Sequence, residues 1–135
     1  MIQTTEIIET LSFFDCWEDR YRYMIELGKE LPAMDNDLKT QDKLVPGCQS
    51  RVWIDWKNIN GLLHFEVDSD ALIVKGLLAL VMAAYQDKSA NDIIEFDIQN
   101  YFEQLDLIKH LSPTRGNGLQ AMIGKIQGAA RQMLD

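Results

Sequence analysis

Apolar residues recur at helical spacing in the first stretch of the chain and predict two helices there. Residues 5–14 and a second stretch that runs to about Leu31 each place their apolar side chains on one face. Asp15, with Glu18 three residues later, has the pattern of an N-cap that starts the second helix. Pro32 ends it, because the proline ring interrupts the helical hydrogen-bond ladder. We expect the two helices to pack antiparallel against each other.

Alternation of apolar and polar residues then predicts a β-hairpin. Residues 33–47 are polar and show no period, and they lead into the alternating run 50–57. A second alternating run covers residues 62–68, and residues 58–61 (Asn-Ile-Asn-Gly) supply the positive φ angles that a tight turn needs. Since a two-stranded ribbon is marginal in water, we expect a short third strand near residues 44–45 or packing on helices to complete it.

The chain then returns to helical spacing. Residues 71–85 are apolar nearly all round, which predicts a helix in the middle of the core that supports the sheet. Ser69 is its predicted N-cap, and Asp70 is an acidic residue in its first turn. Further helices are predicted over residues 89–95, over residues 99–105 and from Ser112-Pro113 to the end of the chain.

The order of helices, hairpin and helices predicts an α+β fold, with a small antiparallel sheet packed against several helices. A length of 135 residues suits one domain with a real core, so residues 1–135 are predicted to be a single domain. A net charge of -8 disfavours nucleic acid and anionic membranes as partners. Residues 1–9 lack a signal-peptide pattern, and two cysteines without dense spacing fit a reducing compartment, which together predict a cytoplasmic protein.

Cys48 is the first candidate for chemistry, because it lies on a predicted loop held by a strand directly behind it. The turn dipeptide Pro46-Gly47 precedes it. Gln49 and Ser50 add hydrogen-bonding groups with little bulk, and Arg51 is a positive neighbour. A thiolate attacks sulfur electrophiles, so such a cysteine needs access and a suitable pKa. From the residues alone, two roles for Cys48 stay open: a reactive thiol, or a small buried apolar side chain without chemistry.

Other residues give weaker signals. Cys16 lies at a predicted helix start between the apolar neighbours Phe14 and Trp17, and it is interpreted as structural. His64 and His110 have no metal-ligand spacing to either cysteine, so no metal site is predicted, and neither is favoured as a base for Cys48. Residues 115–118 (Arg-Gly-Asn-Gly) lack the lysine and the preceding strand of a phosphate loop.

Four segments resemble the SufE/CsdE family, the sulfur-acceptor partners of cysteine desulfurases. They come in the family's order and span nearly the whole chain. The segments are Trp17-Glu18-Asp19-Arg20-Tyr21 with Ile25-Glu26-Leu27-Gly28; Val45-Pro46-Gly47-Cys48-Gln49-Ser50-Arg51-Val52-Trp53; Asp68-Ser69-Asp70-Ala71 with Ile73-Val74-Lys75-Gly76-Leu77; and His110-Leu111-Ser112-Pro113-Thr114-Arg115 with Gly118-Leu119.

The resemblance implies a function for Cys48. It would take the terminal sulfur of a desulfurase persulfide and pass it to an iron–sulfur cluster scaffold or another acceptor. The chain would then be a covalent sulfur carrier that stimulates the desulfurase, without a cofactor of its own, since the pyridoxal phosphate belongs to the partner. The resemblance also implies a fold like that of the IscU-type scaffold and a cysteine loop that swings out on docking. Asp70 and Arg115 match family positions that tune the desulfurase contact.

Gln49, Ser50 and Arg51 are further candidates for the partner interface, because they flank the cysteine. Two other functions stay open. In the first, the chain is a stand-alone thiol redox enzyme with Cys48 as attacking thiol and Cys16 as resolving thiol. In the second, the Cys48 loop is only a non-covalent docking surface. The sequence leaves both a monomer and a homodimer open.

Overall fold

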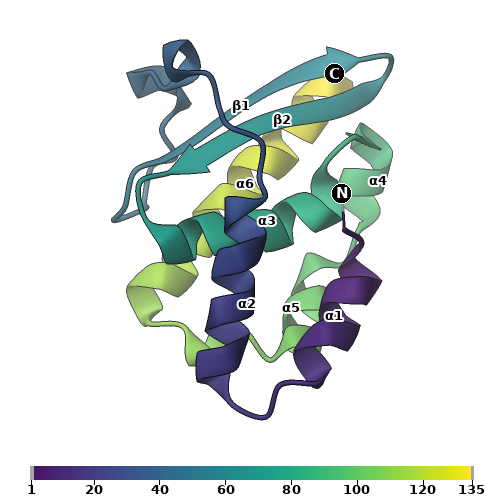
Figure 1. Ribbon diagram of the computed structural model, residues 1–135. Helices are drawn as coiled ribbons and strands as arrows, with labels where there is room; N and C mark the ends of the chain where they lie inside the picture. The colour runs from purple at the N-terminus through teal and green to yellow at the C-terminus, as the bar shows by residue number, and fades with distance from the viewer. Residues whose placement is uncertain (1, 135) are drawn as a thin grey trace.

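The computed structural model describes residues 2–134. Within them the chain forms six α-helices and three strands, connected in part by short 3-10 helices (Figure 1). Helices precede and follow a β-hairpin, which confirms the predicted α+β class. In chain order the elements are α1 (Thr4–Ser12), α2 (Trp17–Lys29), η1 (Asn36–Leu38), η2 (Gln41–Lys43), β1 (Val52–Ile59), β2 (Leu62–Ser69), α3 (Leu72–Tyr85), β3 (Lys88–Ser89), α4 (Ala90–Glu95), α5 (Ile98–Leu105), η3 (Ile108–His110) and α6 (Pro113–Leu134).

The sheet has the strand order β1-β2-β3, with antiparallel pairing throughout. Asn60 and Gly61 connect β1 to β2 with φ angles of 54° and 86°, the left-handed conformations that a two-residue hairpin turn requires. The third strand, β3, pairs with β2 at the hairpin-turn end. The prediction places the third strand near residues 44–45 instead. There Leu44 forms only a single antiparallel bridge, with Trp53, so the third strand is misplaced in the prediction.

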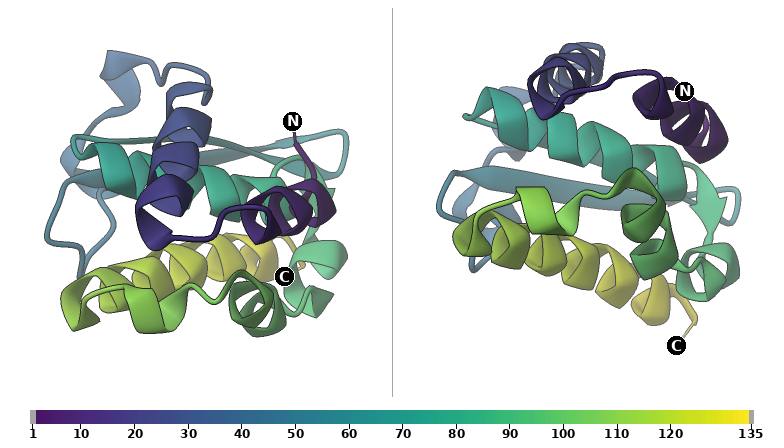
Figure 2. Two further views of the ribbon diagram at one scale, coloured as in Figure 1. Left: turned by 60° about the horizontal axis from the view of Figure 1, so that its bottom comes forward. Right: turned by 90° about the horizontal axis from the view of Figure 1, so that it is seen from below.

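One face of the sheet carries the core, and helices cover it. Most strand residues that face inward are buried, Trp56 on the same face is half-buried, and those on the other face are half-buried or exposed. Helices α3 and α6 lie beneath the sheet, and α1 and α2 lie on the far side of α3, as Figure 2 shows. The buried strand residues on the inward face are Val52, Ile54, Leu63, Phe65, Val67 and Ser69.

Helix α3 is the centre of the molecule, as its apolar sequence predicts. Every residue from Gly76 to Tyr85 is buried. The closest helix contact is the crossing of α2 and α3, where two glycines meet. A Cβ added to Gly28 would lie 2.7 Å from the Gly76 backbone nitrogen, and one added to Gly76 would lie 2.7 Å from the Met24 carbonyl oxygen. The two backbones approach so closely because neither glycine carries a side chain.

Two predicted helix starts are wrong. The N-cap of α2 is Cys16 and not Asp15, because the Cys16 carbonyl accepts the first helical hydrogen bond. The N-cap of α3 is Ala71 and not Ser69. Pairing with β1 extends through Ser69, so that residue ends β2 and Asp70 lies between the strand and the helix, outside the first helical turn.

The remaining helices lie where the sequence predicts them. The expected antiparallel packing of the first two helices is wrong, because α2 packs on α3 while α1 packs on α5 and α3. Ser89 and Asp97 cap α4 and α5 by accepting hydrogen bonds from backbone amides three residues on, and the Ser112 hydroxyl accepts one from the Arg115 amide at the start of α6. The apolar positions predicted for α6 are buried, except Met133, which is half-buried. Of the helices in residues 2–134, none has the length and apolar character needed to cross a membrane.

Candidate functional site

The Cys48 loop projects from the start of β1 and is closed at its base by the backbone. The Val45 amide donates to the Val52 carbonyl oxygen at 2.8 Å, so residues 46–51 form an excursion between two fixed points. Gly47 has a φ of 89°, which is open to glycine and strained for other residues. The predicted loop position of Cys48 is therefore confirmed, with the turn at Pro46 and Gly47 directly before it.

The side chain of Cys48 is half-buried and points toward α6. Its thiol donates to the Gly118 carbonyl oxygen, with the sulfur 3.5 Å from that oxygen. A Cβ on residue 118 would also lie 3.5 Å from this sulfur, so the glycine leaves the thiol room on its helix side. Burial raises the pKa of the Cys48 thiol above its ordinary value, because the apolar surroundings disfavour the charged thiolate. In this position Cys48 is a protonated, sheltered thiol.

Hollows lie on both sides of the Cys48 loop. The inner one is a cavity of about 70 Å³ between the loop, α3 and the start of α6. The outer one is an open depression of about 310 Å³, lined by the loop residues themselves together with Gln41, Leu44 and Val45. The inner cavity is lined by Cys48, Gln49, Ser50, Val52, Val74, Leu77, Ser112, Thr114, Arg115, Gly118 and Met122. Cys48 therefore lines both hollows, and its thiol points toward α6 beside the inner one.

Most of the predicted site residues gather at this loop. Gln49 and Ser50 line both hollows, Arg115 is exposed and lines the inner cavity, and Arg51 lines only the outer depression. Asp70 lines neither. Its carboxylate accepts a hydrogen bond from the Arg51 amide at 3.1 Å, which places it at the point where the loop joins β1.

The prediction omits the residues of the inner cavity that come from α3 and α6 or precede α6, namely Val74, Leu77, Ser112, Thr114, Gly118 and Met122. In sequence these residues look like ordinary core and helix-cap positions, so nothing in the local sequence distinguishes them as residues of a site. Gly118 belongs to residues 115–118, which contain two glycines but lack the other features of a phosphate loop. The one usable signal was the resemblance, whose last segment already brings Ser112, Thr114 and Gly118 together with Arg115.

Neither histidine contacts Cys48. The His64 Nδ1 atom lies 2.8 Å from a carboxylate oxygen of Asp87, near the hairpin turn. The His110 ring stacks on Trp17 with a centroid distance of 3.9 Å, which holds η3 against α2. Among the described residues, no cationic side chain lies close enough to lower the pKa of Cys48, and burial is the cause of its shift. The pairing of Cys48 with a histidine that the sequence left open is therefore not formed.

Cys16 lies at the N-cap of α2 with an exposed side chain. The interpretation of Cys16 as structural rests on Phe14 and Trp17, which are half-buried and pack against the core, but the Cys16 side chain is exposed and belongs to no core cluster. Both cysteines are free thiols, and Cys16 lines neither hollow beside Cys48. Across residues 2–134, no three His, Cys, Asp or Glu side chains gather in a way that would hold a metal ion.

Fold and site together define a class of protein: a small α+β domain that carries one half-buried thiol on a loop beside a cavity. Comparison with known proteins agrees with that class. The family model described as SufE, Fe-S metabolism associated domain, matches residues 5–130. The chain belongs to the SufE family, and its role lies in iron–sulfur metabolism.

Individual relatives extend this result. A SufE-like protein of Rhizobium meliloti is 44% identical over 138 residues, covering 99% of each chain. A SufE-like protein of Rhizobium etli is 42% identical over 135 residues, covering 97% of this chain and 91% of its own. A solution structure of a hypothetical protein from Thermus thermophilus has the same fold, with a TM-score of 0.78 at 19% identity over 99% of this chain and 98% of its own.

Proposed function

We propose that this protein accepts sulfur from a cysteine desulfurase on Cys48, stimulates that enzyme, and relays the sulfur to iron–sulfur cluster assembly. The observation that carries the proposal is the position of Cys48. Its thiol lies on a loop between two fixed backbone points, with a cavity on one side and open surface on the other. A loop on a rigid scaffold can present one atom to another protein while the fold stays intact.

The transfer step is an exchange between sulfur atoms. Cys48, as a thiolate, attacks the terminal sulfur of the donor's cysteine persulfide and forms a new sulfur–sulfur bond. The sulfur–sulfur bond of the donor breaks, and the donor cysteine leaves as a thiolate. No net oxidation or reduction takes place, and Cys48 now carries the persulfide. The protein itself supplies no cofactor to this step, and the pyridoxal phosphate belongs to the desulfurase.

The resting position of Cys48 is unsuited to that attack. Burial raises its pKa, so the thiol keeps its proton, and its sulfur faces α6 and not solvent. The outer depression beside the loop gives the side chain a place to go when the loop moves outward. Outside the cavity the burial that raises the pKa is lost, and the thiolate becomes more accessible. Sulfur transfer is therefore restricted to encounters that draw the loop out.

The exposed residues around the loop define the face that meets the partner. Gln49, Arg51, Asp70 and Arg115 border this face, and Ser50 lies between them. The two arginines make no ion pair within residues 2–134, so their charges are free for a partner. The cysteine desulfurase is the partner that delivers sulfur, and an iron–sulfur scaffold or another acceptor receives it.

The test is desulfurase turnover with and without this protein. We expect the parent chain to raise turnover and Cys48→Ser to abolish the increase, because the serine oxygen cannot hold a sulfane sulfur. Cys16→Ser is the matched control and should stimulate like the parent. If Cys48→Ser stimulates as well as the parent, the loop is a non-covalent docking surface and the proposal fails. If Cys16→Ser loses the effect as well, the two thiols act as a redox pair instead.

A further inference from the structure

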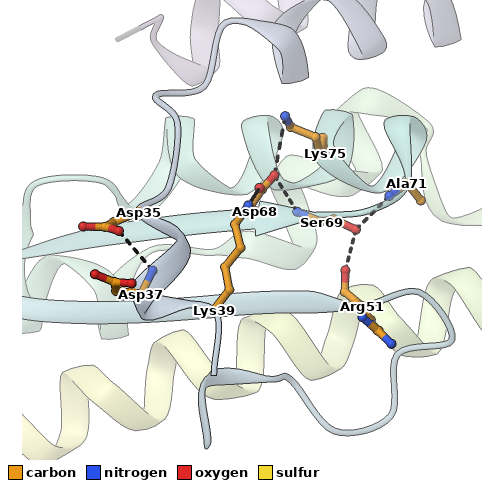
Figure 3. Close-up of polar contacts among 8 residues, drawn as sticks. All are labelled: Asp35, Asp37, Lys39, Arg51, Asp68, Ser69, Ala71 and Lys75. Atoms are coloured by element: carbon orange, nitrogen blue, oxygen red, sulfur yellow. Dashed lines mark hydrogen bonds and ion pairs between the residues drawn. The ribbon is translucent and has the colours of Figure 1, made fainter. Parts of the chain in front are cut away.

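The end of β2 holds the point where the Cys48 loop enters β1. The backbone of Arg51 is held at both its carbonyl and its amide, and Figure 3 shows the bond from the Ser69 hydroxyl to the carbonyl oxygen. Its carbonyl oxygen accepts from the Ser69 hydroxyl at 2.7 Å and from the Asp70 amide at 3.3 Å. Its amide donates to the Asp70 carboxylate at 3.1 Å. Three hydrogen bonds on one residue's backbone, at the last position before a strand, mark a fixed backbone point.

Ser69 is the buried member of this arrangement. It is 6% exposed, and within residues 2–134 it is the one polar or charged residue in the buried class. Its hydroxyl donates to Arg51 and accepts from the Ala71 amide at 3.3 Å, so both of its roles are used. A buried hydroxyl costs free energy unless it is paired, so its presence among apolar core positions needs a reason. The hydroxyl connects the loop end to the start of α3.

The residue beside it holds the segment before the loop. The Asp68 carboxylate lies 2.6 Å from Lys39 Nζ and 3.4 Å from Lys75 Nζ. Lys39 follows η1 in the segment that leads to Cys48, and Lys75 lies on α3 (Figure 3). Asp68 therefore links the segment that precedes the loop to α3, and the neighbouring Ser69 links the end of the loop to the N-cap of α3.

Between Val45 and Arg51 the loop is held at the Cys48 thiol, which donates to the Gly118 carbonyl oxygen at 3.5 Å. Within the described chain, no backbone amide from Gly47 to Ser50 donates a hydrogen bond, whereas the Arg51 amide does. Outward movement of Cys48 breaks the bond from its thiol to the Gly118 carbonyl oxygen, and the first backbone hydrogen bonds that it then meets on the β1 side are those at Arg51. The residue at which the backbone hydrogen bonds begin, here Arg51, therefore sets how far the Cys48 thiol can move.

We infer that Ser69 is a positioning residue for sulfur transfer, whose hydroxyl fixes the Arg51 peptide as the hinge on which the Cys48 loop turns. The inference rests on the proposed function for its last step. With the hinge fixed, the open loop has a single position, and the Cys48 thiolate meets the donor sulfur in a defined geometry. Without the hydroxyl, opening extends into β1, so Cys48 becomes more accessible but is presented less accurately.

The test compares Ser69→Ala with Ser89→Ala, both in a Cys16→Ser background so that Cys48 is the sole thiol. Ser89 is the matched control, because its hydroxyl also makes a structural hydrogen bond, from the Asp92 amide, at the opposite end of the sheet. We expect Ser69→Ala to raise the rate of Cys48 alkylation by iodoacetamide about fivefold, the factor that one ordinary hydrogen bond represents. Ser89→Ala should leave that rate unchanged.

Sulfur transfer provides the second readout. For Ser69→Ala we expect the rate of persulfide formation with a desulfurase and cysteine to fall although alkylation rises, a split that a merely structural role does not produce. If alkylation of Ser69→Ala is no faster than that of Ser89→Ala, or if transfer rises together with alkylation, the inference is overturned. If the parent chain takes no sulfur, the proposed function fails, while the alkylation comparison still tests the hinge.

Amide exchange in the parent chain needs no variant. We expect the amides of Arg51 and Asp70 to be protected and those of residues 47–50 to exchange freely, because the bonds begin at Arg51. Equal exchange at Gln49 and Arg51 would show that the hinge is not fixed, and it would overturn the inference even if Ser69→Ala did not fold.

Discussion

The crossing of α2 and α3 and the Cys48 loop are opposite solutions to packing within one small protein. At the crossing, a Cβ on either glycine would lie 2.7 Å from the backbone of the other helix, and no space is left. At the loop, a cavity of about 70 Å³ lies beside the sulfur, and a Cβ on Gly118 would lie at an ordinary contact distance of 3.5 Å. The first region gives the scaffold its rigidity, and the second leaves one side chain able to move.

The helix between the two regions connects the tight crossing to the cavity. Helix α3 is buried along most of its length, and it lines the inner cavity with Val74 and Leu77. Protein interiors are close-packed, so a space of this size costs contact energy wherever it occurs. Here it occurs next to a loop whose amides make few hydrogen bonds. The tight crossing on the far side of α3 would hold that helix in place during the loop movement that the proposed function requires.

The largest expected effect is at the tight crossing. Gly76→Ala places a methyl group against the Met24 carbonyl, and backbone cannot move aside as a flexible side chain does. We expect the free energy of unfolding to fall by about 2–3 kcal/mol, measured by urea denaturation. Gly128→Ala on α6 is the control: nothing lies within 4 Å of its Cβ position, so it should gain up to about 1 kcal/mol from helix propensity. Equal stability of the two variants would break the comparison.

A smaller effect is expected where charge anchors the loop entry. Burial alone raises the pKa of Asp68, but the bond from Lys39, the Ser69 amide and the charge of Lys75 together lower it below the ordinary value of 3.8. The charged carboxylate therefore stabilises the fold above pH 3.8, and this contribution is lost as the pH falls through the lowered pKa.

We expect Asp68→Asn to reduce the free energy of unfolding by about 1 kcal/mol at neutral pH, and the difference from the parent to vanish in strong acid. The measurement is thermal or urea unfolding across a pH series. Glu66→Gln, on the same face of the sheet and without an ion pair in residues 2–134, should leave the pH dependence unchanged. If Asp68→Asn lowers the free energy of unfolding equally at every pH, the contribution of Asp68 comes from packing and hydrogen bonding and not from its charge.

The smallest effect is expected on the cavity side. Gly118→Ala adds a methyl group in ordinary contact with Cys48, and it replaces a glycine inside a helix. We expect the free energy of unfolding to stay within about 1 kcal/mol of the parent value, with a small gain from helix propensity. The measurement is urea denaturation of Gly118→Ala and Gly76→Ala side by side. If Gly118→Ala loses as much free energy of unfolding as Gly76→Ala, the loop is packed as tightly as the crossing.

Sequence periodicity was sufficient for the parts of the fold that are local. The hairpin follows from alternation and from Asn60-Gly61, and α3 and α6 follow from their apolar positions. Each of these signals lies within the segment that it describes. The loop position of Cys48 is of the same kind, because Pro46-Gly47 and the following strand are its neighbours in sequence.

What the sequence could not predict depends on contacts between distant segments. Strand β3 has two residues and no pattern of its own, and its pairing with β2 creates it. Ser69 resembles a helix cap, but pairing with β1 keeps it in the strand and turns its hydroxyl toward Arg51. The close approach of Gly28 and Gly76, and the cavity that separate segments line beside Cys48, have no local signature at all.

The most direct test of the account is the intact mass of the protein after incubation with a cysteine desulfurase and cysteine. The account predicts an adduct of one sulfur atom that maps to Cys48, is removed by a reductant, and forms equally in a Cys16→Ser background. An unchanged mass under conditions where the desulfurase turns over, or an adduct on Cys16 alone, would contradict it.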